Sequence, residues 1–138
     1  MIINAENLIV GRIATAAAKK ALLGENVDIV NCEKAVIVGN RKQILEKFKQ
    51  RADRGAPLKG PYYPRMPDRL LRRIIRGMLP FKTKRGKEAF KRIMCHMGVP
   101  EQFRNIKTET ISKADVSKKQ TLDYVTIEEI SRFMGAKI

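Results

Sequence analysis

Four arginines in the middle of the chain stand at helical spacing, namely Arg69, Arg72, Arg73 and Arg76. Positions i, i+3, i+4 and i+7 share one face of an α-helix, so their guanidinium groups would project from the same side. Guanidinium groups are always charged, and their N–H groups pair well with phosphate oxygens. The pattern therefore predicts a surface that holds a polyanion.

The helix that would carry these arginines is expected within the stretch Arg65–Pro80. Pro67 suits the first turn, where its missing N–H costs nothing, and Asp68 complements the positive helix end. Pro80 is expected to end the helix. An apolar face at helical spacing completes the pattern and consists of Leu70, Leu71, Ile74, Ile75, Met78 and Leu79. The apolar face would anchor the helix in the core, and the arginine face would bind the polyanion.

Net charge points to the same part of the chain. The protein has 138 residues, 43% of them hydrophobic, and a formal net charge of +15. Residues 41–92 contain 18 Lys or Arg and four Asp or Glu, so this segment alone carries +14. Charge concentrated in this way exceeds what solubility needs and indicates a polyanionic partner.

We predict a single domain over residues 1–138, because a chain of this length can bury a core of its own. It would comprise a near-neutral α/β core (1–40), a basic segment (41–92), and a C-terminal part that packs on the core (93–138).

The first 40 residues predict a small α/β unit. Residues 1–4 and 27–30 are short, mostly apolar runs, and the alanine-rich stretch between them has Asn7 as its expected N-cap and Gly24 as its stop. Strand, helix and strand of this length form a right-handed βαβ unit with parallel strands. Gly11 lacks the companion glycines of a dinucleotide-binding loop, so we expect it at a close-packing position.

A proline-rich loop is expected at Gly55–Pro67, after a helix capped by Asn40. Four prolines and two glycines in these 13 residues exclude a helix and disfavour a central strand. Each of its two tyrosines would either stack on an unpaired base or pack the loop against the domain, and the sequence leaves both interpretations open. The candidate binding residues of this loop are Lys59, Tyr62, Tyr63 and Arg65.

A second basic helix is expected after the first, from the cap Thr83 through Met97, with Gly98 as its stop. Both basic helices are expected to pack together on the sheet, so that their charged faces merge. The cations in and around the second helix are Lys82, Lys84, Arg85, Lys87, Lys91 and Arg92.

The C-terminal part shows less pattern. Residues 107–119 mix charges without a clear period, so either a strand pair or irregular structure is expected. Thr126–Glu129 forms a capping box ahead of a short helix that would end at Gly135. The apolar residues expected to dock this helix on the core are Ile127, Ile130, Phe133 and Met134.

Catalysis and metal binding are not predicted. The few carboxylates of the basic segment are not clustered, as two-metal hydrolysis of nucleic acids would require. His96, the only histidine, has no partner for zinc binding or a nucleophile, and we expect it to pack or stack. Cys32 and Cys95 fit small buried residues in a reducing cytosol. We expect no cofactor, no metal, no small-molecule substrate, no signal peptide and no membrane-spanning segment.

Several segments resemble the ribosomal protein L13 family of the large subunit. They are VGRIAT (Val10–Thr15), VDIVNCEKAVIVGN (Val27–Asn40), IIRGMLP (Ile74–Pro80), GKEAFKRI (Gly86–Ile93) and GVP (Gly98–Pro100). The resemblance implies a three-layer α/β/α domain around a small, mostly parallel sheet, with a basic loop-helix extension. It also implies a non-enzymatic, cytoplasmic protein of the ribosome that binds large-subunit ribosomal RNA (rRNA) beside neighbouring large-subunit ribosomal proteins and has a structural and assembly role.

The resemblance further indicates where RNA is contacted. The bacterial His-His-Thr-Gly loop is replaced here by the stretch Lys47–Pro67, which indicates the archaeal or eukaryotic type. His96 stands where the family often has an aromatic residue. The RNA-contacting basic segment of the family corresponds in this chain to Arg65, Arg69, Arg72, Arg73, Arg76, Lys82, Lys84, Arg85 and Lys87.

The residues predicted to bind rRNA are Lys59, Tyr62, Tyr63, Arg65, Arg69, Arg72, Arg73, Arg76, Lys82, Lys84, Arg85, Lys87, Lys91 and Arg92. The proline-rich loop and the cationic turn are expected to order on binding. Charge reversal at Arg72 and Arg76 is expected to weaken RNA binding without unfolding the domain, and Ile74→Asp to unfold it. Two other classes stay open, a DNA-binding regulator and a nucleic-acid-processing enzyme.

Overall fold

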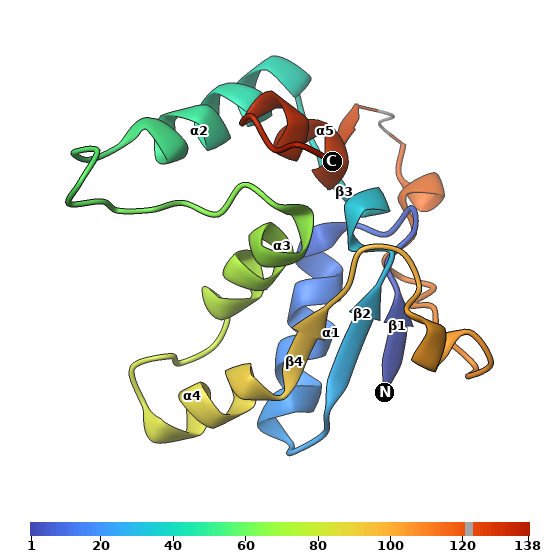
Figure 1. Cartoon of the computed structure of the whole chain (residues 1–138). Helices are drawn as coiled ribbons and strands as arrows, with labels where there is room; N and C mark the ends of the chain where they lie inside the picture. The colour runs from blue at the N-terminus through green and yellow to red at the C-terminus, as the bar shows by residue number, and fades with distance from the viewer. Residues whose placement is uncertain (121–122) are drawn as a thin grey trace.

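The computed structural model describes residues 1–120 and 123–138 (Figure 1). Residues 121–122, which belong to the predicted C-terminal part, lie outside the described residues. The elements in chain order are β1 (Ile2–Asn4), α1 (Val10–Leu22), β2 (Val27–Val30), the 3-10 helix η1 (Cys32–Lys34), β3 (Val36–Val38), α2 (Arg41–Asp53), α3 (Pro67–Arg76), α4 (Lys84–Lys91), β4 (Ile93–Cys95), the 3-10 helices η2 (Glu101–Phe103) and η3 (Val116–Lys118), β5 (Tyr124–Thr126) and α5 (Ile127–Phe133).

Two small sheets organise the chain. The first is parallel, with strand order β1-β2-β4, and it pairs Ile3 with Ile29 and Ile29 with Cys95. The second pairs β3 with β5 in antiparallel orientation, with Ile37 opposite Val125. The predicted parallel β1–α1–β2 unit is therefore confirmed, and so is the mixed α/β class.

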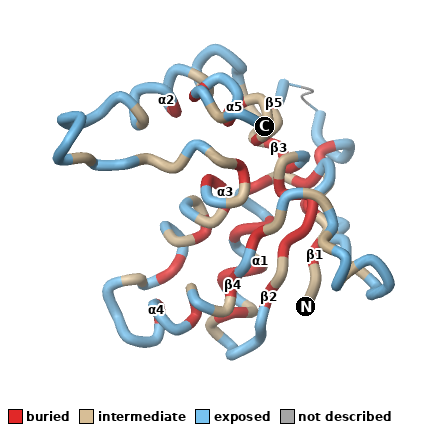
Figure 2. The backbone as a smooth tube through the Cα atoms, viewed as in Figure 1, coloured by how far each residue is buried: buried red, intermediate tan, exposed pale blue. Residues whose placement is uncertain are grey.

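One face of the parallel sheet forms the core against α1, which lies behind the strands in Figure 1. The sheet contributes the fully buried residues Ile3, Ile29 and Ile93, and α1 contributes Ile13 together with a stripe of buried alanines. Small side chains let a helix approach a sheet closely. Helix α1 also contacts α3 and α4, so all three helices share this side of the molecule. Figure 2 shows the buried residues gathered in the strands and these helices.

The opposite face of the parallel sheet differs from the three-layer prediction. Its strand residues include Asp28, which is half-buried, and Met94, which is 44% exposed. His96 is hydrogen-bonded to Asp28 (Nε2 to Oδ1, 3.1 Å), and its ring lies 5.5 Å from that of Phe103 in η2. A 3-10 helix and loop thus cover part of this face, in place of a second layer of α-helices. The packing role predicted for His96 is confirmed.

The second basic helix is shorter than predicted. Helix α4 ends at Lys91, and the residues expected to continue it form strand β4. In β4 the side chains alternate, with Ile93 and Cys95 buried and Met94 exposed. Pairing with the free edge of β2 satisfies the backbone of this segment, and that gain outweighs its local helical pattern.

Three smaller expectations also need correction. Asn7 has a left-handed backbone (φ 57°) and does not cap α1, whose N-cap is Ile9. Gly11 is not a close-packing position, since a Cβ there would meet nothing within 4 Å. Helix α3 ends at Arg76, with Gly77 as its C-cap, and so stops before the predicted end at Pro80.

Helices α2 and α5 pack beside the antiparallel sheet. Asn40 caps α2 as predicted, its side chain accepting the N–H of Lys42 at 3.0 Å. Phe48 is the buried residue of α2, so most of this helix is exposed. Thr126 caps α5 by accepting the N–H of Glu129 at 3.2 Å. The predicted docking of α5 is confirmed for Ile127, Ile130 and Met134, which are buried. The prediction that Phe133 also docks on the core is wrong, because this residue is 48% exposed.

The described part of segment 104–120 is irregular apart from η3, and it runs alongside β1 and the start of α1. The N–H of Asn4 donates to the carbonyl of Glu109 at 3.1 Å, and the N–H of Ile9 donates to that of Ala114 at 2.8 Å. These bonds fix the tail against the core.

Candidate nucleic-acid interface

Helix α3 is anchored through one face. Leu70, Leu71 and Ile75 are fully buried, and Ile74 is half-buried beside them. Pro67 stands at the start of the helix, as its sequence predicts. This anchoring fixes the direction in which the arginines on the other face project.

The four arginines of α3 divide into two pairs. Arg69 and Arg73 are exposed, whereas Arg72 and Arg76 are half-buried. The guanidinium of Arg72 lies 4.5 Å from the centroid of the Phe90 ring, and that of Arg76 lies 4.7 Å from the centroid of Phe81. Arg72 and Arg76 are therefore oriented by aromatic faces. Arg69 and Arg73 have no side-chain hydrogen bond or ion pair with the residues that the structure describes.

The oriented and exposed arginines line one small groove. Its volume is about 170 Å³, and its lining residues are Pro64, Arg69, Arg72, Arg73, Arg76 and Phe90. Phosphate groups are recognised by convergent guanidinium donors of this kind. The groove carries no carboxylate in its lining, so an anion there would meet only positive charge.

Aromatic side chains join α4 to the turn that follows α3. The rings of Phe81 and Phe90 form an edge-to-face pair with centroids 5.4 Å apart, beneath the guanidinium groups of Arg76 and Arg72. Gly86 is buried where the chain enters α4, and a Cβ there would overlap the carbonyl of Pro80. This packing sets the cationic turn against the end of α3.

The remaining cations of this region are mostly exposed. Thr83 caps α4 as predicted, since its hydroxyl accepts the N–H of Gly86 at 3.1 Å. Arg92 is half-buried and donates to the carbonyl of Ala21 at 3.4 Å, at the C-terminal end of α1. The exposed residues are Lys82, Lys84, Arg85, Lys87 and Lys91.

The two loop tyrosines take different roles. Tyr63 is half-buried, and its ring centroid lies 6.4 Å from that of Phe48 in α2, so it packs the loop against the domain. Tyr62 is 75% exposed and free to stack on a base. Lys59 and Arg65, on either side of the tyrosines, are exposed.

Ion pairs leave the predicted binding residues available. In the part of the chain that the structure describes, carboxylates form ion pairs with Lys20, Lys34, Arg41 and Arg132. No predicted rRNA-binding cation is among them. Their charge is therefore not neutralised within the described residues.

The two thiols do not suit catalysis. Cys32 and Cys95 are both buried, and burial raises the pKa of each thiol, that of Cys95 to about 12. A protonated thiol is neither a nucleophile nor a metal ligand. Residues 1–120 and 123–138 contain no group of three or more His, Cys, Asp or Glu that could hold a metal ion. Among the same residues, no helix is long and apolar enough to cross a membrane.

Sequence reasoning missed a second cluster of cations. Arg12 and Lys19 on α1 line a groove with Lys113 and Lys118 of the tail. The spacing of Arg12, Thr15 and Lys19 on the exposed side of α1 is a sequence signal for half of it. No local sequence pattern predicts that Lys113 and Lys118 of the tail lie beside α1.

Comparison with known proteins assigns the chain to a family. A family model described as Ribosomal protein L13 matches residues 1–102. The chain belongs to the ribosomal protein L13 family. The match spans every predicted rRNA-binding residue of this L13 family member and confirms the resemblance drawn from its sequence. L13 proteins are ribosomal proteins, so the prediction that the chain is not an enzyme is confirmed.

Archaeal members of the L13 family are similar over nearly the whole chain. A protein of Methanopyrus kandleri is 47% identical, with 97% of this chain and 86% of the relative covered. Proteins of Methanococcus maripaludis and Methanosarcina barkeri are 47% and 43% identical, each with 99% of this chain and 98% of the relative covered. All three are named large ribosomal subunit protein uL13.

Proposed function

We propose that this protein is a structural constituent of the large ribosomal subunit, where it binds and stabilises folded rRNA during assembly. Its partners are large-subunit rRNA and neighbouring large-subunit ribosomal proteins. The single observation that carries the proposal is the arginine face of α3, where two guanidinium groups are oriented by aromatic rings and two are exposed around one groove.

The proposed binding surface combines three kinds of contact. Arg69 and Arg73 neutralise backbone phosphates and release counterions, which makes affinity strongly dependent on salt. The exposed cations of the α4 region extend this contact. Tyr62 supplies a stacking surface for an unpaired base. Specificity comes from the shape of the folded RNA, since the deep groove of an A-form helix excludes side chains.

We also infer that the chain acts as one domain. One hydrophobic core includes Ile13 of the near-neutral segment, Leu71 of the basic segment and Ile130 of the C-terminal part. The basic segment is therefore held by the same core that forms the sheet. A rigid core fixes the spacing between the binding residues and reduces the ordering that binding would cost.

The proposal is tested with the double variant Arg69→Gln and Arg73→Gln. Binding to an in vitro transcript of large-subunit rRNA is measured over a range of salt concentrations. Each lost phosphate contact lowers the salt slope by about 0.7–0.9 log units per log unit of salt, so the expected decrease is about 1.4–1.8.

The matched control is Arg41→Gln with Arg132→Gln, since both arginines are ion-paired with carboxylates of α5. It removes the same charge from the protein. If the two double variants bind the transcript with the same affinity and salt slope, the α3 face is not the binding surface and the proposal fails.

A further inference from the structure

A second cationic groove lies between α1 and the tail, outside the predicted binding surface. Its volume is about 630 Å³. Ala16 and Ile111 contribute apolar surface, and four cations surround them: Arg12, Lys19, Lys113 and Lys118. These cations come from segments about 100 residues apart in sequence.

The groove is fixed by hydrogen bonds between its two sides. The N–H of Ile9 donates to the carbonyl of Ala114 at 2.8 Å, and the N–H of Val116 donates to that of Asn7 at 3.1 Å. The guanidinium of Arg12 donates to the carbonyl of Lys113. Because these bonds hold the tail beside the start of α1, the backbone positions that carry the cations are fixed without a ligand.

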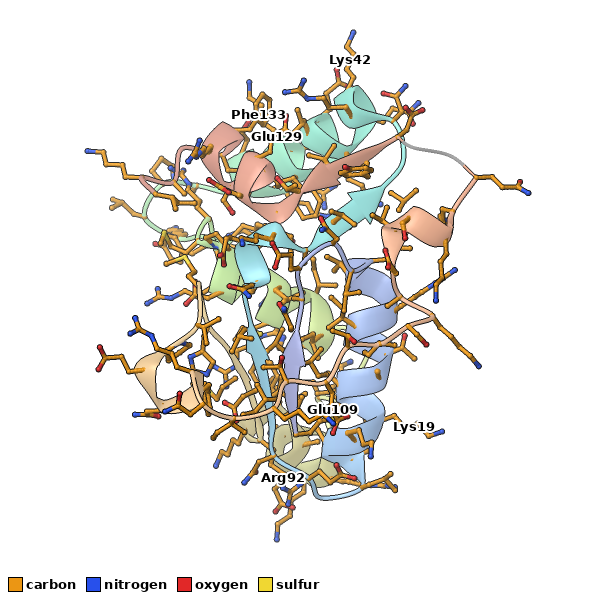
Figure 3. The ribbon with its side chains drawn as sticks, turned by 90° about the vertical axis from the view of Figure 1, so that its right-hand side faces the viewer. Lys19, Lys42, Arg92, Glu109, Glu129 and Phe133 are labelled. Atoms are coloured by element: carbon orange, nitrogen blue, oxygen red, sulfur yellow. The ribbon has the colours of Figure 1, made fainter. Side chains whose placement is uncertain are left out.

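Two of the four cations are available for binding. Among the described residues, Lys19 and Lys113 form no ion pair through their ammonium groups, and both are exposed. Figure 3 shows Lys19 projecting from α1 away from the body of the molecule. Lys20, its neighbour in sequence, is instead paired with Glu25 at 3.1 Å.

Acidic residues do not neutralise this groove. Its lining contains no Asp or Glu. The nearest acid in sequence, Asp115, accepts the N–H of Ser117 at 2.9 Å and caps the turn of η3. This hydrogen bond and the nearby charge of Lys118 both lower the pKa of its carboxyl, so Asp115 offsets part of the Lys118 charge and leaves Lys19 and Lys113 as exposed cations of the groove. Four cations around an apolar floor match the alternating phosphates and sugars of a nucleic-acid backbone.

We propose that this α1–tail groove binds a second segment of large-subunit rRNA, so that the protein joins two RNA segments. The inference rests on the proposed function. The two surfaces are carried by neighbouring elements, since the hydroxyl of Thr15 on α1 lies 3.6 Å from the sulfur of Met78 after α3. RNA segments held at the two surfaces would be fixed in their relative orientation by the core that carries both.

The first test is the double variant Lys19→Gln and Lys113→Gln, with binding to the same rRNA transcript measured against salt. Loss of two phosphate contacts is expected to lower the salt slope by about 1.4–1.8. The control is Lys20→Gln with Lys34→Gln, which removes the same charge from ion-paired lysines and is expected to keep the parent slope. Equal slopes for the two double variants would overturn the proposal.

The second test locates the RNA directly. The native thiols are buried, so a single surface cysteine can be labelled selectively with a tethered iron-EDTA cleavage reagent. Ser112→Cys reports on the groove, and Glu88→Cys reports on the α3–α4 surface, and both positions are exposed. Two separate clusters of rRNA cleavage are expected from the two positions.

The outcomes separate this inference from the proposed function. Cleavage from position 88 alone would overturn the second RNA site and leave the proposed function standing. Cleavage from position 88 alone is also the result expected if the groove binds a neighbouring ribosomal protein in place of RNA, because that protein is absent from the assay with naked rRNA. Cleavage from neither position would overturn both.

Discussion

The guanidinium of Arg72 lies 4.5 Å from the ring centroid of Phe90, and its Nε donates to the carbonyl of Ile93 at 3.0 Å. The Arg72 side chain therefore connects α3 to the end of α4 and to the start of β4. Spacing alone groups Arg72 with its three helical neighbours as a phosphate ligand. The structure gives it a stabilising role as well, and this changes what its substitution should do.

We expect Arg72→Ala to lower the free energy of unfolding by about 1–3 kcal/mol, because hydrogen bonds from a charged donor and a cation–π contact are lost. Charge reversal at Arg72 should therefore destabilise the domain, contrary to the expectation from sequence. Urea denaturation followed by circular dichroism measures the effect. Arg73→Ala is the control, since this arginine is exposed, and it should stay within about 0.5 kcal/mol of the parent. Equal stability of the two variants would refute the role assigned to Arg72.

The two tyrosines of the proline-rich loop should respond in opposite ways. Tyr62→Ala removes an exposed ring and is expected to weaken rRNA binding by about 1–3 kcal/mol, or about five- to 150-fold, without lowering the melting temperature. Tyr63→Ala removes a ring packed near Phe48 and should lower the melting temperature. Filter binding and thermal melts on both variants measure the two effects. If Tyr62→Ala lowered the melting temperature and left the affinity unchanged, Tyr62 would be a packing residue and its proposed role in RNA binding would be wrong.

Replacing each of two helical glycines by alanine should have opposite effects on stability. Gly86→Ala is expected to destabilise the protein, because its Cβ would overlap the carbonyl of Pro80 and force the cationic turn away from α4. Gly11→Ala is the matched control in α1, where a Cβ meets nothing within 4 Å, and it should gain up to about 1 kcal/mol from helix propensity. Melting temperatures of the two variants should shift in opposite directions. A stabilised Gly86→Ala protein would contradict the close approach of the turn.

Stability should fall in alkaline solution because of the buried thiols. Burial raises the pKa of Cys95 to about 12 in the folded protein, above its ordinary value. The folded state therefore holds this proton more tightly than the unfolded state does. The stabilisation is complete below about pH 8.5, where an unfolded thiol is protonated, and it is lost as the pH rises toward 12.

Urea denaturation between about pH 7 and pH 10.5 tests this dependence, with Cys95→Ala as the comparison. The variant should be less stable at neutral pH because it leaves a cavity, but its stability should fall less steeply with pH. The other ionisable groups are the same in both proteins, so the difference between the two slopes reports on Cys95 together with its effect on the neighbouring Cys32. Parallel slopes would show that Cys95 is not shielded from water in the folded state.

Several elements could be predicted from local sequence because their signals are local. Pro67 and Asp68 mark the start of α3, and the capping residues Asn40 and Thr83 mark the starts of α2 and α4. Each signal depends on backbone groups within four residues, which the sequence displays directly. The βαβ unit is predictable for a related reason, since its two strands are separated by a single helix.

Strand β4 shows where local sequence reasoning fails. Residues 93–97 continue the helical spacing of α4, yet Ile93–Cys95 pairs with β2, more than 60 residues earlier. The free edge of a strand and the apolar side of a sheet are available only once the chain has folded. Strand pairing and burial at these sites stabilise the extended conformation by more than helix propensity stabilises the helix.

The sequence by itself determined the charge of this protein, the segment that carries most of it, the arginine face of α3 and the membership of the L13 family. The charge, its location and the arginine face follow from composition and short-range spacing, whereas the family membership follows from the resemblance of several segments to the L13 family and from the family-model match over residues 1–102. Only the tertiary structure decided that Arg72 is fastened to Phe90, that Tyr63 packs and Tyr62 is exposed, and that Lys19 and Lys113 share a groove. Those relationships join residues far apart in the chain, and long-range packing of the core brings them together.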